Sequence, residues 1–152
     1  MERRSLDLLL APWLVRPVEH VGSTAIPGLA AKPILDFQAG VRHLSAASEV
    51  AEALKNHAWH YVPPEIDGDH PWRRFFVKVV DERRFAHLHL MDVASARWTE
   101  QLAFRNALRA DRSLASRYAQ LKTDLAEQHR DDREAYSLAK AAFIQDVVYP
   151  TP

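Results

Sequence analysis

The sequence predicts an α+β domain of two layers, with helices packed on a sheet and a helical block at the C-terminal end. Two observations predict this class. Residues between 33 and 91 include three segments of strand character, and from residue 97 onward apolar residues recur at helical spacing. The expected order is helix, strand, helix, hairpin and helical block, which is typical of an α+β domain. At 152 residues, we expect the whole chain, residues 1–152, to form a single domain.

The first part of the chain is expected to hold a helix, a strand and a second helix. Residues 5–14 have the composition of a short helix that ends near Pro12. Residues 33–41 alternate with period two, so Asp36 and Gln38 share one face of a strand. Ser45 is then expected to cap a helix that runs to about His57, whose apolar stripe consists of Ala47, Val50, Ala51 and Leu54.

The second part begins with a proline-rich loop at residues 63–71. Residues 74–80 and 85–91 then have the character of two strands joined at residues 81–82, an antiparallel hairpin on which His87 and His89 point the same way. Three helices are expected at residues 97–109, 114–129 and 134–148, and their apolar stripes predict that they pack on the sheet.

Composition excludes several classes of function. Twenty basic and twenty acidic residues cancel, so no global positive field attracts a nucleic acid, and we do not expect nucleic acid as a partner. The chain has no cysteine, which excludes disulfides, thiolate metal sites and cysteine nucleophiles. The apolar run near the start is too short for a membrane span and contains proline. We therefore expect a cytoplasmic protein without a membrane partner.

The most informative motif is a glycine-serine turn followed by the lone carboxylate of Asp36, with twelve residues between Ser23 and Asp36. Gly22 allows the backbone to approach a ligand closely, and Ser23 and Thr24 offer hydroxyls and amides to phosphate oxygens. Asp36 is placed to hold a divalent cation. The motif predicts that the partner is a nucleotide or another phosphorylated small molecule, although the same loop could simply connect two elements.

This motif resembles the signature of the nucleotidyltransferase superfamily, with Val21-Gly22-Ser23 followed by the strand residues 36–39. Within it, the segment GSTAIPGLAAKPILD is similar to the GrpB family (UPF0157), which is also found fused to some bacterial dephospho-CoA kinases. The likeness continues through residues 87–89, 104–105, 118–122 and 136–140. The resemblance implies a nucleotidyltransferase-like mixed sheet packed against helices. Typical members of that family carry an extra strand and helical turn ahead of the first helix, and this sequence does not show them.

The resemblance further implies a magnesium-binding site on the aspartate strand. Asp36, Gln38 and His89 are the candidate metal ligands, and Asp36 and Ser23 the candidate catalytic residues. Gln38 stands where a second acid is usual, and its neutral amide should lower affinity for Mg²⁺. The two histidines could equally be a packing residue and a surface residue. A histidine triad is not reproduced, because Met91 replaces the third histidine, and a zinc site of His87, His89 and Asp92 lacks a further ligand.

Cationic side chains supply the remaining candidates for phosphate binding. Lys32 precedes the aspartate strand, and an ammonium there could reach a phosphate or remain a solvated loop residue. Tyr118 with Lys122, and Tyr136 with Lys140, lie four residues apart on helix faces that are either cleft walls or ordinary amphipathic edges. The full set of candidate substrate-binding residues is Gly22, Ser23, Thr24, Lys32, Lys78, His87, Arg105, Lys122 and Lys140, with Arg74 as a further cation.

Two functions follow from these observations. The first is a magnesium-dependent transferase that acts on a nucleotide. The second is a non-catalytic binding or assisting module, with a protein partner such as dephospho-CoA kinase, and the neutral Gln38 favours it.

Overall fold

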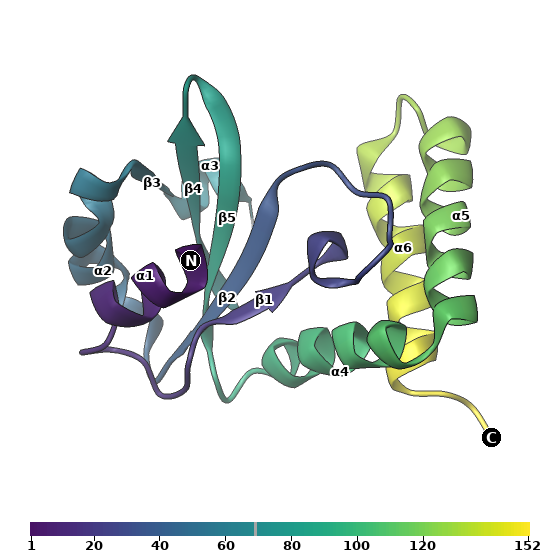
Figure 1. Cartoon of the computed structure of the whole chain (residues 1–152), viewed down its shortest axis with the longest axis horizontal. Helices are drawn as coiled ribbons and strands as arrows, with labels where there is room; N and C mark the ends of the chain where they lie inside the picture. The colour runs from purple at the N-terminus through teal and green to yellow at the C-terminus, as the bar shows by residue number, and fades with distance from the viewer. Residues whose placement is uncertain (69) are drawn as a thin grey trace.

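A computed structural model describes residues 1–68 and 70–152; Asp69, within the expected proline-rich loop, lies outside the described residues. The strands form one five-stranded sheet in the order β1-β2-β5-β4-β3 (Figure 1). β2 and β5 are parallel and the other neighbours are antiparallel, so the sheet is mixed. The strands are β1 (Glu19–Val21), β2 (Leu35–Val41), β3 (Trp59–Val62), β4 (Arg73–Val80) and β5 (Arg83–Asp92).

Six α-helices accompany this sheet in the described part of the chain: α1 (Glu2–Leu9), α2 (Ala47–Leu54), α3 (Pro64–Asp67), α4 (Ala96–Ala110), α5 (Arg112–Gln128) and α6 (Arg133–Val148). The side chains of Ser95, Asp111 and Asp132 accept hydrogen bonds from the first turns of α4, α5 and α6. These caps satisfy otherwise free N–H groups and set where each helix begins. No helix among the described residues combines the length and apolar character needed to cross a membrane.

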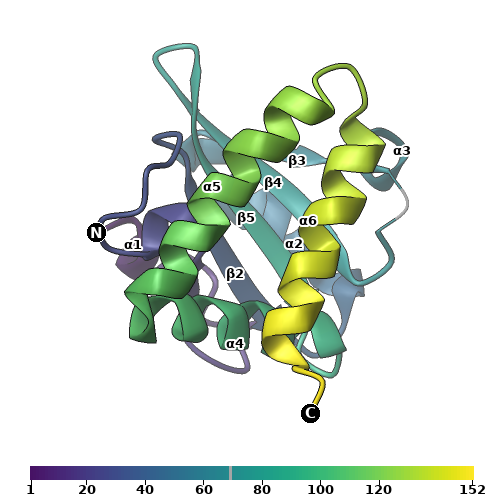
Figure 2. The same cartoon turned by 90° about the vertical axis from the view of Figure 1, so that its right-hand side faces the viewer.

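Two separate hydrophobic cores hold the fold together. The first lies between one face of the sheet and helices α1 and α2, and includes Leu6, Leu54, Phe37, Phe76 and Leu88. The second lies within the helical block and consists of Ile26, Phe104, Leu108, Leu114 and Tyr118. Figure 1 shows the helical block on the side of the sheet away from α1 and α2, and Figure 2 shows α5 and α6 in front of β2 and β5.

The α+β class, the hairpin and the three C-terminal helices are confirmed. The hairpin turn is tight, since Asp81 and Glu82 both have positive φ (50° and 62°) and join β4 directly to β5. These three helices differ from their expected bounds by at most two residues at either end.

Two local predictions are wrong, and two short strands were not predicted. The first helix ends at Leu9 rather than near Pro12, because Leu14 bridges Val41 and the Val15 amide donates to the Gly40 carbonyl, so pairing with β2 takes this segment out of the helix. Ser45 caps no helix; it lies inside a 3-10 helix (η2, Leu44–Ala46). Residues 19–21 and 59–62, for which no strand was predicted, form β1 and β3.

Candidate functional site

The sheet face turned toward the helical block carries a row of polar side chains. In the parallel pairing of β2 with β5, Asp36 lies beside His87 and Gln38 beside His89. On the other side of β2, Val21 pairs with Asp36. Directly paired residues point to the same face of a sheet, so this register gathers four polar side chains from two strands that are about fifty residues apart in sequence.

The glycine-serine turn lies against Asp36. Gly22 has φ 73°, a conformation that favours glycine. A Cβ atom at this position would lie 2.8 Å from Oδ2 of Asp36. Ser23 and Asp36 both line a cavity of about 280 Å³ between the sheet and the helical block. The hydroxyl-bearing turn and the aspartate strand therefore meet at one cavity.

Asp36 is held as a carboxylate. Its Oδ1 lies 3.3 Å from Nδ1 of His87 and 3.5 Å from Nε2 of His89. Burial by itself would raise the pKa of Asp36, but the hydrogen bonds from His87 and His89 outweigh burial and hold its pKa well below the ordinary value. Asp36 is therefore an acceptor at neutral pH.

A chain of polar contacts orients His89. Arg73 binds Asp67 through two nitrogens, at 3.1 and 2.6 Å, and its Nη1 lies 2.9 Å from Nδ1 of His89. A guanidinium group only donates hydrogen bonds, so Nδ1 of His89 is the acceptor. The ring proton of His89 therefore resides on Nε2, which faces Asp36. Burial, with the neighbouring charge of Arg73, lowers the pKa of His89 despite the opposing effect of Asp36. His89 is thus a neutral donor to Asp36.

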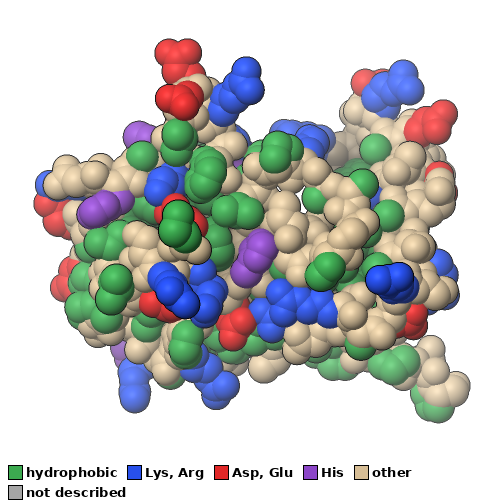
Figure 3. Space-filling model, viewed as in Figure 1, with side chains coloured by type: hydrophobic (Ala, Val, Ile, Leu, Met, Phe, Trp, Pro, Cys, Tyr) green, Lys and Arg blue, Asp and Glu red, His purple; other side chains and the backbone are tan. Residues whose placement is uncertain are grey.

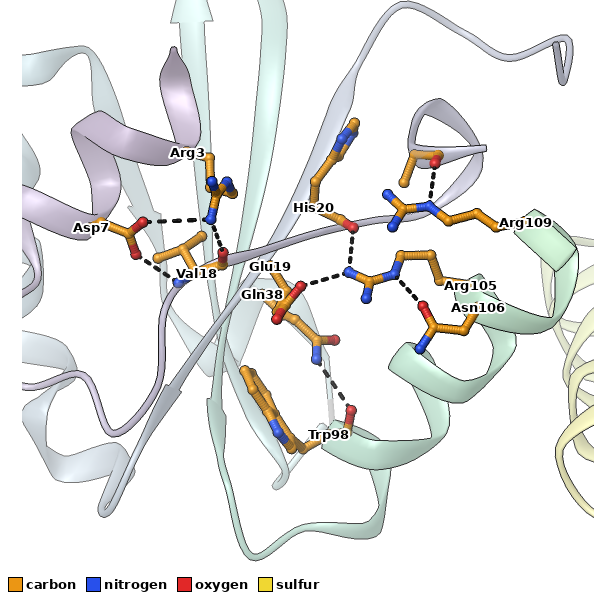
Figure 4. Close-up of polar contacts among 11 residues, drawn as sticks. Arg3, Asp7, Val18, Glu19, His20, Gln38, Trp98, Arg105, Asn106 and Arg109 are labelled. Atoms are coloured by element: carbon orange, nitrogen blue, oxygen red, sulfur yellow. Dashed lines mark hydrogen bonds and ion pairs between the residues drawn. The ribbon is translucent and has the colours of Figure 1, made fainter. Parts of the chain in front are cut away.

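Gln38 and His87 each keep one buried polar atom without a partner. Gln38 is 1% exposed, and its Nε2 donates to the Trp98 carbonyl at 3.2 Å (Figure 4). Its Oε1 has no hydrogen-bond partner among the described residues, and neither has Nε2 of His87. Gln38 lines the cavity beside Asp36. An unpaired acceptor at a cavity wall is a feature that a bound ligand would satisfy.

Two lysines from the helical block approach the turn. Nζ of Lys122 donates to Oγ of Ser23 at 2.6 Å and lies over the ring of Tyr118. Lys140 lines the cavity. Burial, and then the charge of Lys140, lower the pKa of Lys122, while Asp36 acts in the opposite direction. Tyr118 is buried, and burial raises its pKa far above the ordinary value, so it stays a neutral phenol.

Other candidates hold the turn in place. Arg105 donates to Glu19 at 2.7 Å and to the His20 carbonyl at 3.0 Å, which ties α4 to β1 (Figure 4). Oγ1 of Thr24 is 2.8 Å from Nε2 of His20. Arg105 also lines the cavity. In the space-filling view, basic side chains gather where β1 and α4 meet (Figure 3).

Two expected lysines lie elsewhere. Lys32 is exposed and does not line the cavity. Lys78 points to the opposite face of the sheet, where it binds Glu2 at 2.7 Å and lies over the ring of Trp59. An irregularity between Lys78 and Val79 shifts the β4–β5 register by one residue, and such a shift turns side chains to the other face.

Sequence reasoning missed Arg73, Asp67, Trp72 and Gln101. The expected strand began at Arg74, whereas β4 begins at Arg73, and consecutive residues of a strand point to opposite faces. Arg73 rather than Arg74 therefore reaches the cavity. The sequence signal that could have indicated Arg73 was a proline-rich stretch followed by arginine and aromatic residues.

The residues around Asp36 do not form a magnesium site by themselves. Oδ1 of Asp36 is shared by two histidines, and both nitrogens of His89 are engaged. Gln38 offers one neutral oxygen. Among residues 1–68 and 70–152, no group of three or more His, Cys, Asp or Glu is placed to hold a metal ion. A magnesium ion here would need further oxygen ligands from a substrate or water.

Comparison with known proteins identifies the family of the chain. The family model described as GrpB protein matches residues 1–149. The chain belongs to the GrpB family. It is 34% identical over 144 residues to the UPF0157 protein YqkA of Bacillus subtilis, and 30% identical over 139 residues to the glutamate-rich protein GrpB of Alkalihalophilus pseudofirmus.

These GrpB relatives differ in length. The matched segments cover 95% and 88% of this chain, but 40% of YqkA and 78% of the A. pseudofirmus protein. The crystal structure of the conserved protein GrpB from Enterococcus faecalis resembles this fold with a TM-score of 0.76 and 31% identity, over 97% of this chain and 86% of that one. The comparisons thus agree on the GrpB family and on its fold.

Proposed function

We propose that this GrpB-family protein binds a phosphorylated small molecule, nucleotides included, in the cavity between the sheet and the helical block. The observation that carries the proposal is a pair of cations beside a hydroxyl. Lys140 lines the cavity, and Lys122 donates to Ser23, which also lines it.

The two lysines differ from the arginines of the same wall. Arg73 and Arg105 form ion pairs with Asp67 and Glu19, whereas neither lysine forms one among the described residues. The charge of Lys140 lowers the pKa of Lys122, which is a sign of mutual repulsion. A phosphate bound between them would relieve that repulsion and accept their hydrogen bonds. No cysteine is present, and a ligand of this class fits a cytoplasmic location.

This proposal has two finer forms, which differ in whether the ligand reacts. Magnesium-dependent nucleotidyl transfer is favoured by the contact of the Gly22 turn with Asp36. A non-catalytic module that assists an enzyme such as dephospho-CoA kinase is favoured by Gln38, a neutral residue in the place of an acid that is fixed by its hydrogen bond to Trp98.

Isothermal titration calorimetry tests the proposal, with inorganic phosphate, AMP and ATP as ligands, each with and without Mg²⁺. Lys140→Met should weaken phosphate binding by about tenfold, since one charge-assisted hydrogen bond is lost. The matched control is Lys55→Met, because Lys55 is exposed and lies in a 3-10 helix (η3, Lys55–His57) next to α2. The proposal fails if no phosphate compound binds, or if both variants lose affinity equally.

Incubation with ATP, Mg²⁺ and candidate acceptors separates the finer forms. Pyrophosphate release that Asp36→Asn abolishes would support transfer. Binding without turnover would support the assisting module.

A further inference from the structure

We propose that the ligand of the cavity is a small phosphorylated polyhydroxyl compound, of the size of a monosaccharide phosphate, whose hydroxyl groups donate to Asp36 and Gln38. This inference rests on the proposed function and narrows it from phosphorylated small molecules in general. Three features of the cavity carry it: an unpaired acceptor, a neighbouring carboxylate and a limited volume.

The unpaired acceptor is Oε1 of Gln38. The amide cannot rotate to exchange its ends without loss, because Nε2 donates to the Trp98 carbonyl. The side chain is almost fully buried, so solvent reaches Oε1 poorly, and no described residue donates to it. Buried acceptors are nearly always satisfied in native proteins. A ligand hydroxyl or amine in the cavity would supply the missing donor.

The neighbouring carboxylate of Asp36 also favours a ligand that donates hydrogen bonds. The histidines approach Oδ1 of Asp36, and no described residue donates to Oδ2. The two acceptors belong to alternate residues of β2, whose Cα atoms lie roughly 6.6 Å apart along the strand. The phosphate group of a monoester suits these acceptors poorly, because at neutral pH it is mostly an unprotonated dianion that accepts hydrogen bonds and is repelled by the carboxylate of Asp36. Hydroxyls at separated positions of a sugar can donate to both.

The cavity wall combines acceptors, a cation and apolar side chains. Asp36 and Gln38 line it from β2, and Ser23 and Lys140 line it from the turn and from α6. The wall also has a large apolar part, which includes Val21, Ile26, Met91, Phe104, Leu108 and Ile144. Such a wall offers acceptors to the hydroxyls of a sugar phosphate, a cation to its phosphate and apolar contact to the C–H faces of its ring.

The volume limits the size of the ligand. About 280 Å³ is slightly below the range of roughly 300–1,000 Å³ that holds drug-sized ligands. A monosaccharide phosphate has about half as many non-hydrogen atoms as ATP. We therefore expect the cavity to enclose the smaller compound and to leave much of a nucleoside triphosphate outside.

Calorimetry with glucose 6-phosphate, glucose, inorganic phosphate, AMP and ATP tests the inference. We expect glucose 6-phosphate to bind at least tenfold more tightly than each of the other four. Gln38→Met, which keeps the length of the side chain, should weaken glucose 6-phosphate by about tenfold and leave inorganic phosphate unchanged. Asp36→Asn should also weaken glucose 6-phosphate, but leave inorganic phosphate unchanged or stronger, because a negative charge is removed.

The outcomes separate this inference from the proposed function. If AMP or inorganic phosphate binds as tightly as glucose 6-phosphate, or if both variants weaken all phosphates equally, the inference is overturned and the proposed function stands. If no phosphate compound binds, both are overturned. Should Gln38→Met fail to fold, as judged by circular dichroism, the opposite responses of the two ligands to Asp36→Asn decide the question.

Discussion

Gly22→Ala probes the contact that brings the turn and Asp36 together. Gly22 has φ 73° and ψ −174°, a region that essentially only glycine adopts, and an L-residue there costs of order 1–3 kcal/mol. The added Cβ would lie 2.8 Å from Oδ2 of Asp36, closer than real Cβ contacts, and 3.0 Å from its Cβ. Overpacking of this kind costs about 1–3 kcal/mol. We therefore expect Gly22→Ala to lower the free energy of unfolding by about 2–6 kcal/mol.

Gly28→Ala is the matched control. Gly28 also has a positive φ, 77°, but a Cβ there would meet no atom within 4 Å. It should lose only the backbone contribution of roughly 1–2 kcal/mol. Urea denaturation followed by circular dichroism at pH 7 measures both losses, provided that the m-values agree. Equal losses for the two variants would refute the close approach of Gly22 to Asp36.

Two further predictions concern Asp36 and Lys78. Because the pKa of Asp36 is lower in the folded state, its ionisation stabilises the fold above its unfolded pKa of about 4, and this contribution is lost as the pH falls. The unfolding free energy of the wild type should thus decrease relative to Asp36→Asn between pH 5 and 3 in urea titrations; a constant difference would contradict this. Lys78→Met should lower the unfolding free energy by about 1–3 kcal/mol, because the bond to Glu2 is lost, with the affinity for inorganic phosphate unchanged. A tenfold weaker affinity would instead assign Lys78 to the binding site.

Local signals were sufficient for the long elements of the fold. Each C-terminal helix has fifteen or more residues, so its apolar stripe repeats several times, and a capping residue stands before it. β1 and β3 have three and four residues, too few for a period-two pattern. Their pairing with β2 and β4 makes them strands, and such pairing is invisible in a single segment.

The site was predictable only where its residues are close in sequence. Gly22, Ser23 and Asp36 lie within fifteen residues, so one motif contains them. The neighbours of Asp36 depend on the parallel pairing of β2 with β5, which no local pattern specifies. The position of Lys78 also could not be predicted from local sequence. A regular hairpin closed at Asp81 and Glu82 would place Lys78 on the face of His87, and the irregularity beside Val79 reverses this.

The position of the cavity follows from the loop after β1, which the helical block and the sheet hold from two sides. Ile26 belongs to the core of the helical block, although it directly follows the turn that begins at β1. Arg109 donates to the Ala25 carbonyl (Figure 4). Lys122 donates to Ser23, so α4 and α5 hold the turn from one side. On the other side, Gly22 lies against Asp36. A loop held from both sides has little freedom to lose when a ligand binds, which favours a preformed site. The same arrangement keeps the helical block from closing on the sheet, because the turn stands between them. A cavity lined by Asp36 and Gln38 therefore remains between the sheet and the helical block.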